Sequence, residues 1–260
     1  MKTVLIFAAL AVVAFASMSR TPTETGGSTA PASPSGALHA QTSTAPPGSA
    51  PARVNPLHDP RGIHPGLTPV PSTQLARARA LIQRVRTAPA GLQAGYRRDR
   101  FGVAWTDDTT DTWGHNGCKT REDILRRDLR GIEYRAGTND CVVLTGILQE
   151  PYAPKFVEFS KARPLEVQID HVMPLSYDWK QGASGWTLER RKQIANDPLN
   201  LLAVDGPLNQ AKSDSGPADW MPPNAAVRCA YSVRFAQVSR RYRLPVRPQD
   251  KTTMLGACSS

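Results

Sequence analysis

Apolar and polar residues alternate most clearly over residues 166–170, where every second position is apolar. This period of two predicts a short strand, and Pro174 keeps it from continuing as a long central one. A second β-prone run covers residues 199–204 and closes at the turn signal of residues 205–207, Asp-Gly-Pro. Helical spacing begins again over residues 209–212. The pattern therefore predicts a strand, a turn, a second strand and a helix.

Periods of three to four residues predict further helices. We expect them at residues 73–87, from about 120 to 129, at 188–196, at 228–242 and from about 249 to 255. Two more strands are expected at 141–148 and 155–159, joined by a Pro-rich turn and lying as a hairpin beside the strand at 166–170. Together these elements predict an α+β fold, with a small antiparallel sheet surrounded by about four or five helices.

The first part of the chain has a different composition. Residues 1–17 carry one lysine, a short apolar run and small residues at the spacing of a signal-peptidase site, so we predict a signal peptide. An uncleaved membrane anchor is the alternative. Residues 18–72 are rich in Ser, Thr, Pro, Gly and Ala, which predicts a disordered linker. The remaining residues, 73–260, form the predicted folded domain, which we expect to be a secreted monomer without membrane contact.

Charge narrows the class of partner. The chain carries 32 Lys and Arg against 22 Asp and Glu, a formal net charge of +10. Arginines line the predicted helix at 73–87 and follow it at Arg97, Arg98 and Arg100. Such a surface gains affinity for nucleic acid by displacing counterions from phosphates. Anionic envelope polymers attract the same charge, and both alternatives stay open on composition alone.

Four cysteines in an exported chain predict two disulfides. Of the three connectivities, we favour Cys118–Cys141 and Cys229–Cys258, because each pair closes a short, local loop. A zinc site on cysteines is the weaker alternative, because no two cysteines have the close spacing of zinc ligands.

Three polar residues at the ends of the predicted elements carry the candidate chemistry. Asp170 and Asn209 offer oxygen ligands of the kind that Mg²⁺ takes in small numbers, leaving other positions for water and phosphate. His171 is a candidate general base, because an unperturbed imidazole is largely neutral near pH 7. Neighbours on a regular strand face opposite sides, so Asp170 and His171 share a site only if the strand bends or ends there.

The three segments IDHVMPLS, LNLLAV and LNQAKSD resemble the HNH (ββα-metal) endonuclease motif. More closely, the chain from about Tyr96 to Cys258 resembles secreted actinobacterial HNH proteins, which share a domain with the C-terminal half of a modification-dependent restriction enzyme. The block GYRRDRFGVAWTDDTTDTWGHNGCKTREDILRRDL belongs to the same resemblance. It implies a nuclease with a ββα-metal site.

The resemblance also implies roles for single residues. His171 would be the general base, Asp170 and Asn209 the metal ligands, and Asn200 the residue that ties down the loop carrying His171. Asn209 stands where many relatives have His, and its amide oxygen favours Mg²⁺ or Mn²⁺ over zinc.

Two basic residues are candidates for phosphate contacts. Arg121 lies in a block that resembles the family, with a structural ion pair as its alternative role. Lys212 lies near the predicted metal ligands, where it would add positive charge.

The sequence thus predicts a secreted, metal-dependent endonuclease that hydrolyses phosphodiester bonds in DNA, and in RNA as an open alternative, with little sequence preference. Two other classes remain. One is a non-catalytic cationic module that binds nucleic acid or envelope polymers. The other is a metal-dependent hydrolase of another phosphoester.

Overall fold

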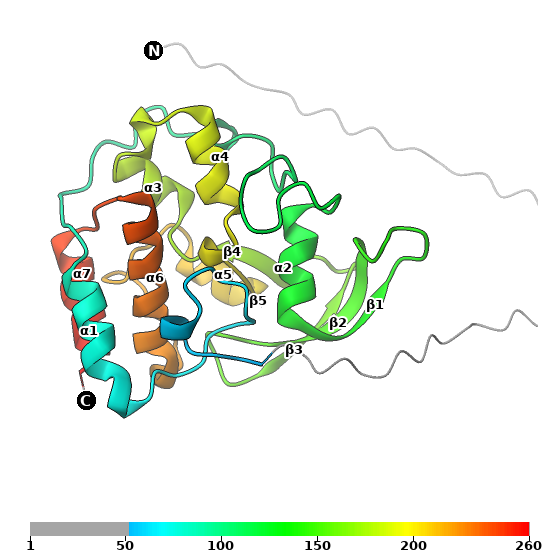
Figure 1. The fold of residues 1–260 in the computed structure, drawn as a ribbon, viewed down its shortest axis with the longest axis horizontal. Helices are drawn as coiled ribbons and strands as arrows, with labels where there is room; N and C mark the ends of the chain where they lie inside the picture. The colour runs from blue at the N-terminus through cyan, green and yellow to red at the C-terminus, as the bar shows by residue number, and fades with distance from the viewer. Residues whose placement is uncertain (1–51, 260) are drawn as a thin grey trace, which may run out of the picture. The chain divides into compact units, whose positions relative to one another are not determined.

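Strand β4 (Val167–His171) pairs antiparallel with β5 (Leu201–Asp205), and helix α5 (Gly206–Lys212) follows β5 directly (Figure 1). Val167 lies opposite Asp205, and His171 lies opposite Leu201. The side chain of Asp205 accepts a hydrogen bond from the backbone N–H of Leu208 and so caps α5, as Asp does at many helix starts. The predicted order of strand, strand and helix is confirmed.

The computed structural model describes residues 52–259. The predicted signal peptide, residues 1–17, and most of the predicted linker lie outside these residues. Within the described range no helix has both the length and the apolar composition that crossing a bilayer requires.

The other strands form a separate sheet. Strands β1 (Leu129–Tyr134), β2 (Val143–Gln149) and β3 (Phe156–Ser160) are antiparallel, in the order β1-β2-β3. The predicted hairpin is therefore confirmed, but the prediction that it joins the strand at 166–170 in one sheet is wrong. The free edge of β2 pairs with β1, a strand that the helical spacing up to residue 129 conceals, and the hydrogen bonds of β4 go to β5.

Seven α-helices occur in the described residues: α5, which follows the strand pair, and six others, where four or five were predicted around the sheet. Besides α5 they are α1 (Leu75–Gln83), α2 (Thr120–Asp128), α3 (Leu175–Lys180), α4 (Leu188–Asn196), α6 (Arg228–Tyr242) and α7 (Pro248–Ala257). Helices α4 and α6 match their predicted bounds. Helix α3 has only six residues, too few for a helical period to show in the sequence.

Two apolar clusters hold these elements together. The larger packs α6 against α1, α3 and α7, and the smaller lies between α2 and the strands. Strand β5 separates them: Leu201 and Ala203 belong to the smaller cluster, and Leu202 and Val204 belong to the larger. Both faces of β5 are buried, which explains why its sequence is an unbroken apolar run instead of an alternating one.

The segment from residue 52 to residue 72 is part of this packed unit. Leu57 and Leu67 are buried in the larger cluster. Asp59 forms an ion pair of 2.8 Å with Arg234 of α6, and both side chains are 1% exposed. The predicted boundary between linker and domain at Thr73 therefore does not coincide with the start of the packed chain.

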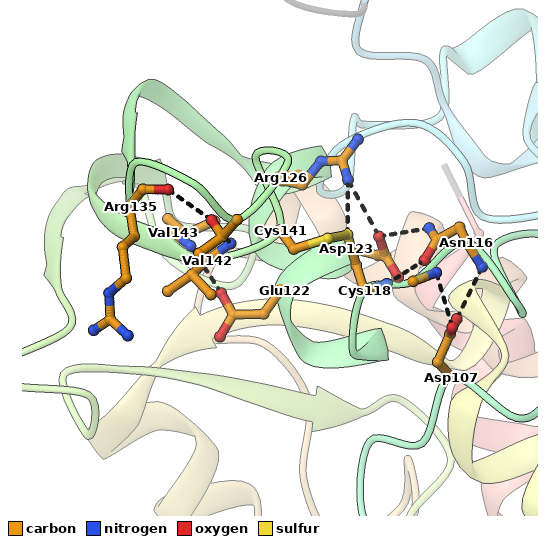
Figure 2. Close-up of a disulfide and its surroundings, with 12 residues drawn as sticks. Asp107, Asn116, Cys118, Glu122, Asp123, Arg126, Arg135, Cys141, Val142 and Val143 are labelled. Carbon is orange, nitrogen blue, oxygen red and sulfur yellow. Dashed lines mark hydrogen bonds and ion pairs between the residues drawn. A yellow bond between two sulfur atoms is a disulfide. The ribbon is translucent and has the colours of Figure 1, made fainter.

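Both predicted disulfides are confirmed, Cys118–Cys141 and Cys229–Cys258. Figure 2 shows the first, which joins the segment before α2 to the segment before β2. Asp107 accepts hydrogen bonds from the backbone N–H groups of Asn116 and Gly117, at 3.1 and 2.9 Å, and Asn116 donates to Asp123 of α2. These contacts fix the long segment between residues 102 and 119 against α2.

Candidate active site

The strand–strand–helix unit places Asp170, His171 and Asn209 on the wall of one cavity of about 800 Å³. Asp170 and His171 are neighbours in sequence, yet both line this cavity. The strand ends at His171, and the next residue, Val172, donates its backbone N–H to the carbonyl of Asn200. Asp170 and His171 are the last two residues of the paired strand, so the cavity that both line lies at the end of β4.

The ring of His171 is fixed by two contacts. Its Nε2 lies 2.9 Å from the carbonyl oxygen of Ala195, and its ring stacks on Trp105 with a centroid distance of 5.5 Å and an angle of 14°. A carbonyl oxygen only accepts hydrogen bonds, so Nε2 carries the proton and donates it. In neutral His171 the lone pair therefore lies on Nδ1, which makes no hydrogen bond within residues 52–259.

His171 is neutral in this environment. Burial lowers its pKa to about 3, and the positive charge of Arg98 acts in the same direction. The hydrogen bond to Ala195 opposes this shift without reversing it. A neutral imidazole whose Nδ1 is unprotonated has the form that a general base requires.

Asp170 is 4% exposed and binds two polar partners. Tyr152 donates its hydroxyl to Oδ2 at 2.6 Å, and Lys212 donates Nζ to Oδ1 at 2.9 Å. Burial raises the pKa of Asp170, while Lys212 and the Tyr152 hydrogen bond lower it. Because a carboxylate oxygen has two lone pairs, both oxygens keep capacity for a further ligand.

Asn209 lies on α5 and is half-buried. Its amide nitrogen donates to Oε1 of Gln168 at 2.8 Å, which fixes the side-chain amide. The amide oxygen makes no hydrogen bond in the described part of the chain. Asn209 therefore presents a hard oxygen donor to the cavity that Asp170 also lines.

Asn200 is fully buried and holds the segment that follows His171. Its Oδ1 accepts from the backbone N–H of Met173 at 2.8 Å, and its Nδ2 donates to the carbonyl of Met173 at 3.1 Å and to that of Ile194 at 3.3 Å. These bonds join the end of β4 to the end of α4. Asn200 does not line the cavity, and its role as the residue that ties down the loop carrying His171 stays a prediction.

The two predicted phosphate contacts differ in their surroundings. Lys212 is 0% exposed and donates to both Asp170 and the carbonyl of His171, so its ammonium does not reach the cavity. Its position contradicts a direct phosphate contact, because the side chain is fully enclosed and two of its three N–H groups hold β4 against α5. Arg121 does line the cavity, where its guanidinium donates to the carbonyls of Pro164 and Val167.

The sequence pattern does not predict the contacts that three further residues make at the site. Tyr152 belongs to the Pro-rich turn between β2 and β3, and its bond to Asp170 spans 18 residues. Trp105 lies in an acidic, aromatic segment, where the sequence indicates only a packing role. Arg98 reads as one of many surface arginines, yet it lines the cavity and forms no ion pair within residues 52–259.

The donor set suits a sparse oxygen site. No group of three or more His, Cys, Asp or Glu side chains converges in the part of the chain that the structure describes. The site therefore lacks the ligand set of a structural zinc centre, and one carboxylate with one amide oxygen matches what a Mg²⁺ ion takes when phosphate and water complete its shell.

Comparison with known proteins identifies the family of this chain. Residues 119–256 match the family model of the C-terminal domain of GmrSD restriction endonucleases. A protein from Arthroderma benhamiae, described as an uncharacterized secreted protein, is 36% identical over 196 residues, which cover 74% of this chain and 89% of that protein. No solved structure matches the chain. The chain thus belongs to the family of GmrSD restriction endonuclease C-terminal domains, an HNH-type nuclease family.

Proposed function

We propose that this protein is a secreted, metal-dependent endonuclease that hydrolyses phosphodiester bonds in DNA or RNA with little sequence preference. The observation that carries the proposal is that Asp170, His171 and Asn209 line one cavity, with Nδ1 of His171 free of hydrogen bonds among the described residues. Membership of a nuclease family supports a nucleic acid as the substrate.

The cation in this proposal is Mg²⁺ or Mn²⁺, held by the carboxylate of Asp170 and the amide oxygen of Asn209. The fit rests on the chemistry of the donors, because both are hard oxygen ligands and both keep free lone pairs. A bound cation would stabilise the negative charge that builds on the phosphate and on the departing oxygen. Strand β4, strand β5 and helix α5 would then form a ββα-metal motif.

The remaining chemistry belongs to the chain itself. Nδ1 of His171 takes a proton from water while the water oxygen attacks phosphorus opposite the leaving oxygen. The bond from phosphorus to the leaving oxygen breaks, and that oxygen takes a proton from a second water molecule. Ala195 and Asn200 keep the imidazole in place, the first through Nε2 and the second through the segment that follows His171. A pKa of about 3 makes His171 a weak base in the free protein. The negative charge of a bound phosphate would offset the charge of Arg98 and raise the basicity of the ring.

Two further features fit an exported nuclease. The relative from Arthroderma benhamiae is described as secreted, and two disulfides suit an oxidising compartment. A net charge of +10 supports binding to phosphate backbones without reading their sequence.

The direct test is nicking of supercoiled plasmid by the purified protein. Cleavage should require Mg²⁺ or Mn²⁺, stop with EDTA and return when the cation is restored. His171→Ala should lower the rate by about 100-fold or more with little loss of DNA binding, because general acid–base groups contribute about 10²–10⁴. Asn209→Ala should also lose cleavage and keep its thermal stability, because the side chain is half-buried and makes one hydrogen bond.

Two results would overturn parts of this proposal. Equal nicking by His171→Ala and the parent protein would exclude His171 as the base. Tight plasmid binding without cleavage in either cation would favour the non-catalytic cationic module.

A further inference from the structure

A second cavity, of about 560 Å³, adjoins the active-site cavity. The two share Arg98, Trp105, His171 and Leu175 in their walls, so they meet at these four residues. The second cavity differs in chemistry, because most of its wall is apolar. Its apolar side chains include Phe101, Val103, Trp105, Leu175 and Leu188.

Trp105, which forms part of the cavity wall, has a strained backbone conformation. The backbone of Trp105 has a φ of 57°, in the left-handed region that bulky residues avoid. Strain of this kind persists only where surrounding contacts impose it, and it is frequent at functional sites. The indole ring of this residue stacks on His171.

Several contacts impose that geometry on residues 102–119, which we call the Trp105 loop. Lys192 of α4 pairs with Asp108 at 2.8 Å, and the hydroxyl of Thr120 donates to the carbonyl of Thr106 at 2.8 Å. The disulfide Cys118–Cys141 and the hydrogen bonds to Asp107 fix the end of the loop (Figure 2). The cavity wall is therefore built before any ligand arrives.

The mouth of the cavity exposes apolar surface beside a positive charge. Val103 is 78% exposed and Leu188 is 49% exposed. Arg98, which has no acidic partner within residues 52–259, lies at the junction with the active-site cavity. An apolar, aromatic wall next to an unpaired guanidinium and a phosphate-cleaving site complements one chemical unit, a nucleobase attached to a charged backbone.

We propose that this apolar cavity binds an unstacked nucleobase next to the phosphate that is cleaved. The inference rests on the proposed nuclease function and names its substrate class. A base in a duplex is paired and stacked, and it enters a pocket only after leaving the stack. The enzyme therefore prefers single-stranded or locally opened nucleic acid over intact duplex.

Binding without cleavage tests the cavity directly. In EDTA, calorimetry would compare a single-stranded tetramer of thymidine with an abasic tetramer that has the same phosphates. The parent protein should bind the thymidine tetramer about 10-fold or more tightly, because stacking on an aromatic side chain contributes about 1–3 kcal/mol per base. Using the ratio of the two affinities removes the contribution of backbone charge.

Leu188→Asn should reduce this ratio at least threefold, because it makes the cavity mouth polar without changing the charge. The matched control is Leu92→Asn, an exposed leucine outside both cavities, which should keep the ratio of the parent. Equal affinities for the two tetramers in the parent protein would overturn the proposal, and so would an unchanged ratio in Leu188→Asn.

The plasmid assay separates this inference from the proposed function. Metal-dependent nicking together with equal affinities for the two tetramers would support the proposed nuclease function and exclude the base pocket. A higher affinity for the thymidine tetramer without any cleavage would support the base pocket and exclude the nuclease function.

Discussion

At the scale of single residues, hydrogen bonds from neighbouring residues fix the side chains that line the site. Tyr152 and Lys212 fix the carboxylate of Asp170, Gln168 fixes the amide of Asn209, and Ala195 fixes the ring of His171. For Asn209 and His171 these bonds leave the amide oxygen and Nδ1 without a partner in the described residues, and for Asp170 each oxygen keeps a second lone pair. Side chains held in this way lose little further freedom on binding, which favours catalysis.

The buried imidazole also has a consequence for stability. Burial lowers the pKa of His171 to about 3 in the folded protein, whereas an exposed His has a pKa near 6.5. Between these values the unfolded chain binds the proton and the folded chain does not, so stability falls as the pH drops from about 6.5 toward 3. His171→Ala removes this dependence.

We expect the parent protein to lose about 2 kcal/mol more stability than His171→Ala when the pH falls from 7 to 5. Denaturant unfolding at both pH values measures the difference. Glu150, whose pKa burial raises to about 7, acts with the opposite sign in both proteins and cancels. His115→Ala is the control for loss of an exposed His, and equal pH dependence in parent and His171→Ala would contradict the prediction.

At the scale of elements, the site is the meeting point of β4, β5, α5 and the Trp105 loop. The first three are adjacent through a strand pair and a direct strand-to-helix junction, so the local chain sets their arrangement. The Trp105 loop comes from far earlier in the chain, and it depends on a disulfide to the segment before β2 and on an ion pair with α4. It should therefore be the first part of the site to loosen when a tether is lost.

The two disulfides offer a matched test of this dependence. They close loops of similar length, with sequence separations of 23 and 29 residues, so removing either should cost about 3 kcal/mol by loop entropy. Replacing Cys118 and Cys141 by Ala should also lower plasmid cleavage at a temperature where the protein stays folded. Replacing Cys229 and Cys258 should leave cleavage close to that of the parent.

Thermal unfolding and nicking rates, measured on both double variants, give the comparison. An equal loss of cleavage in the two would show that the Trp105 loop has no special dependence on its disulfide.

At the scale of the whole described unit, the segment 52–72 closes the larger apolar cluster. Asp59 of this segment and Arg234 of α6 form an ion pair with both side chains almost fully buried, across 175 residues of sequence. Composition alone assigns the segment to a linker, because Ser, Pro and Gly dominate its surroundings. A few apolar residues and one aspartate give it a structural role.

A chain shortened to begin at Thr73 should therefore be destabilised, because it leaves the guanidinium of Arg234 buried without its partner. Breaking a buried ion pair costs about 3–5 kcal/mol, and the lost packing of Leu57 and Leu67 adds to that. A chain that begins at Ala52 is the control, because it keeps Asp59, Leu57 and Leu67, and it should be the more stable of the two. Equal melting temperatures for the two shortened chains would place the boundary at Thr73 after all.

The local pattern of apolar residues was sufficient to predict the elements that are long enough to show a clear period. The bounds of α4 and α6 agree with their predicted ranges, and the β4–β5–α5 order follows from alternation, a turn signal and helical spacing. Local pattern failed for α3, which is too short, and for β1, whose first residue continues a helical spacing. The candidate site was predicted for the same reason, because Asp170, His171, Asn200 and Asn209 lie within one stretch of the chain that resembles a known motif.

The sequence by itself determined the class of fold and the cysteine pairs, and it predicted the candidate site residues, because each of these depends on residues close together in the chain. Only the tertiary structure decided that β4 forms a sheet apart from the hairpin, that Lys212 is buried against Asp170, and that Trp105 covers His171. These outcomes depend on which distant surfaces become adjacent when the apolar clusters form. A periodic pattern specifies which face of an element is buried, but it does not specify the partner against which that face packs.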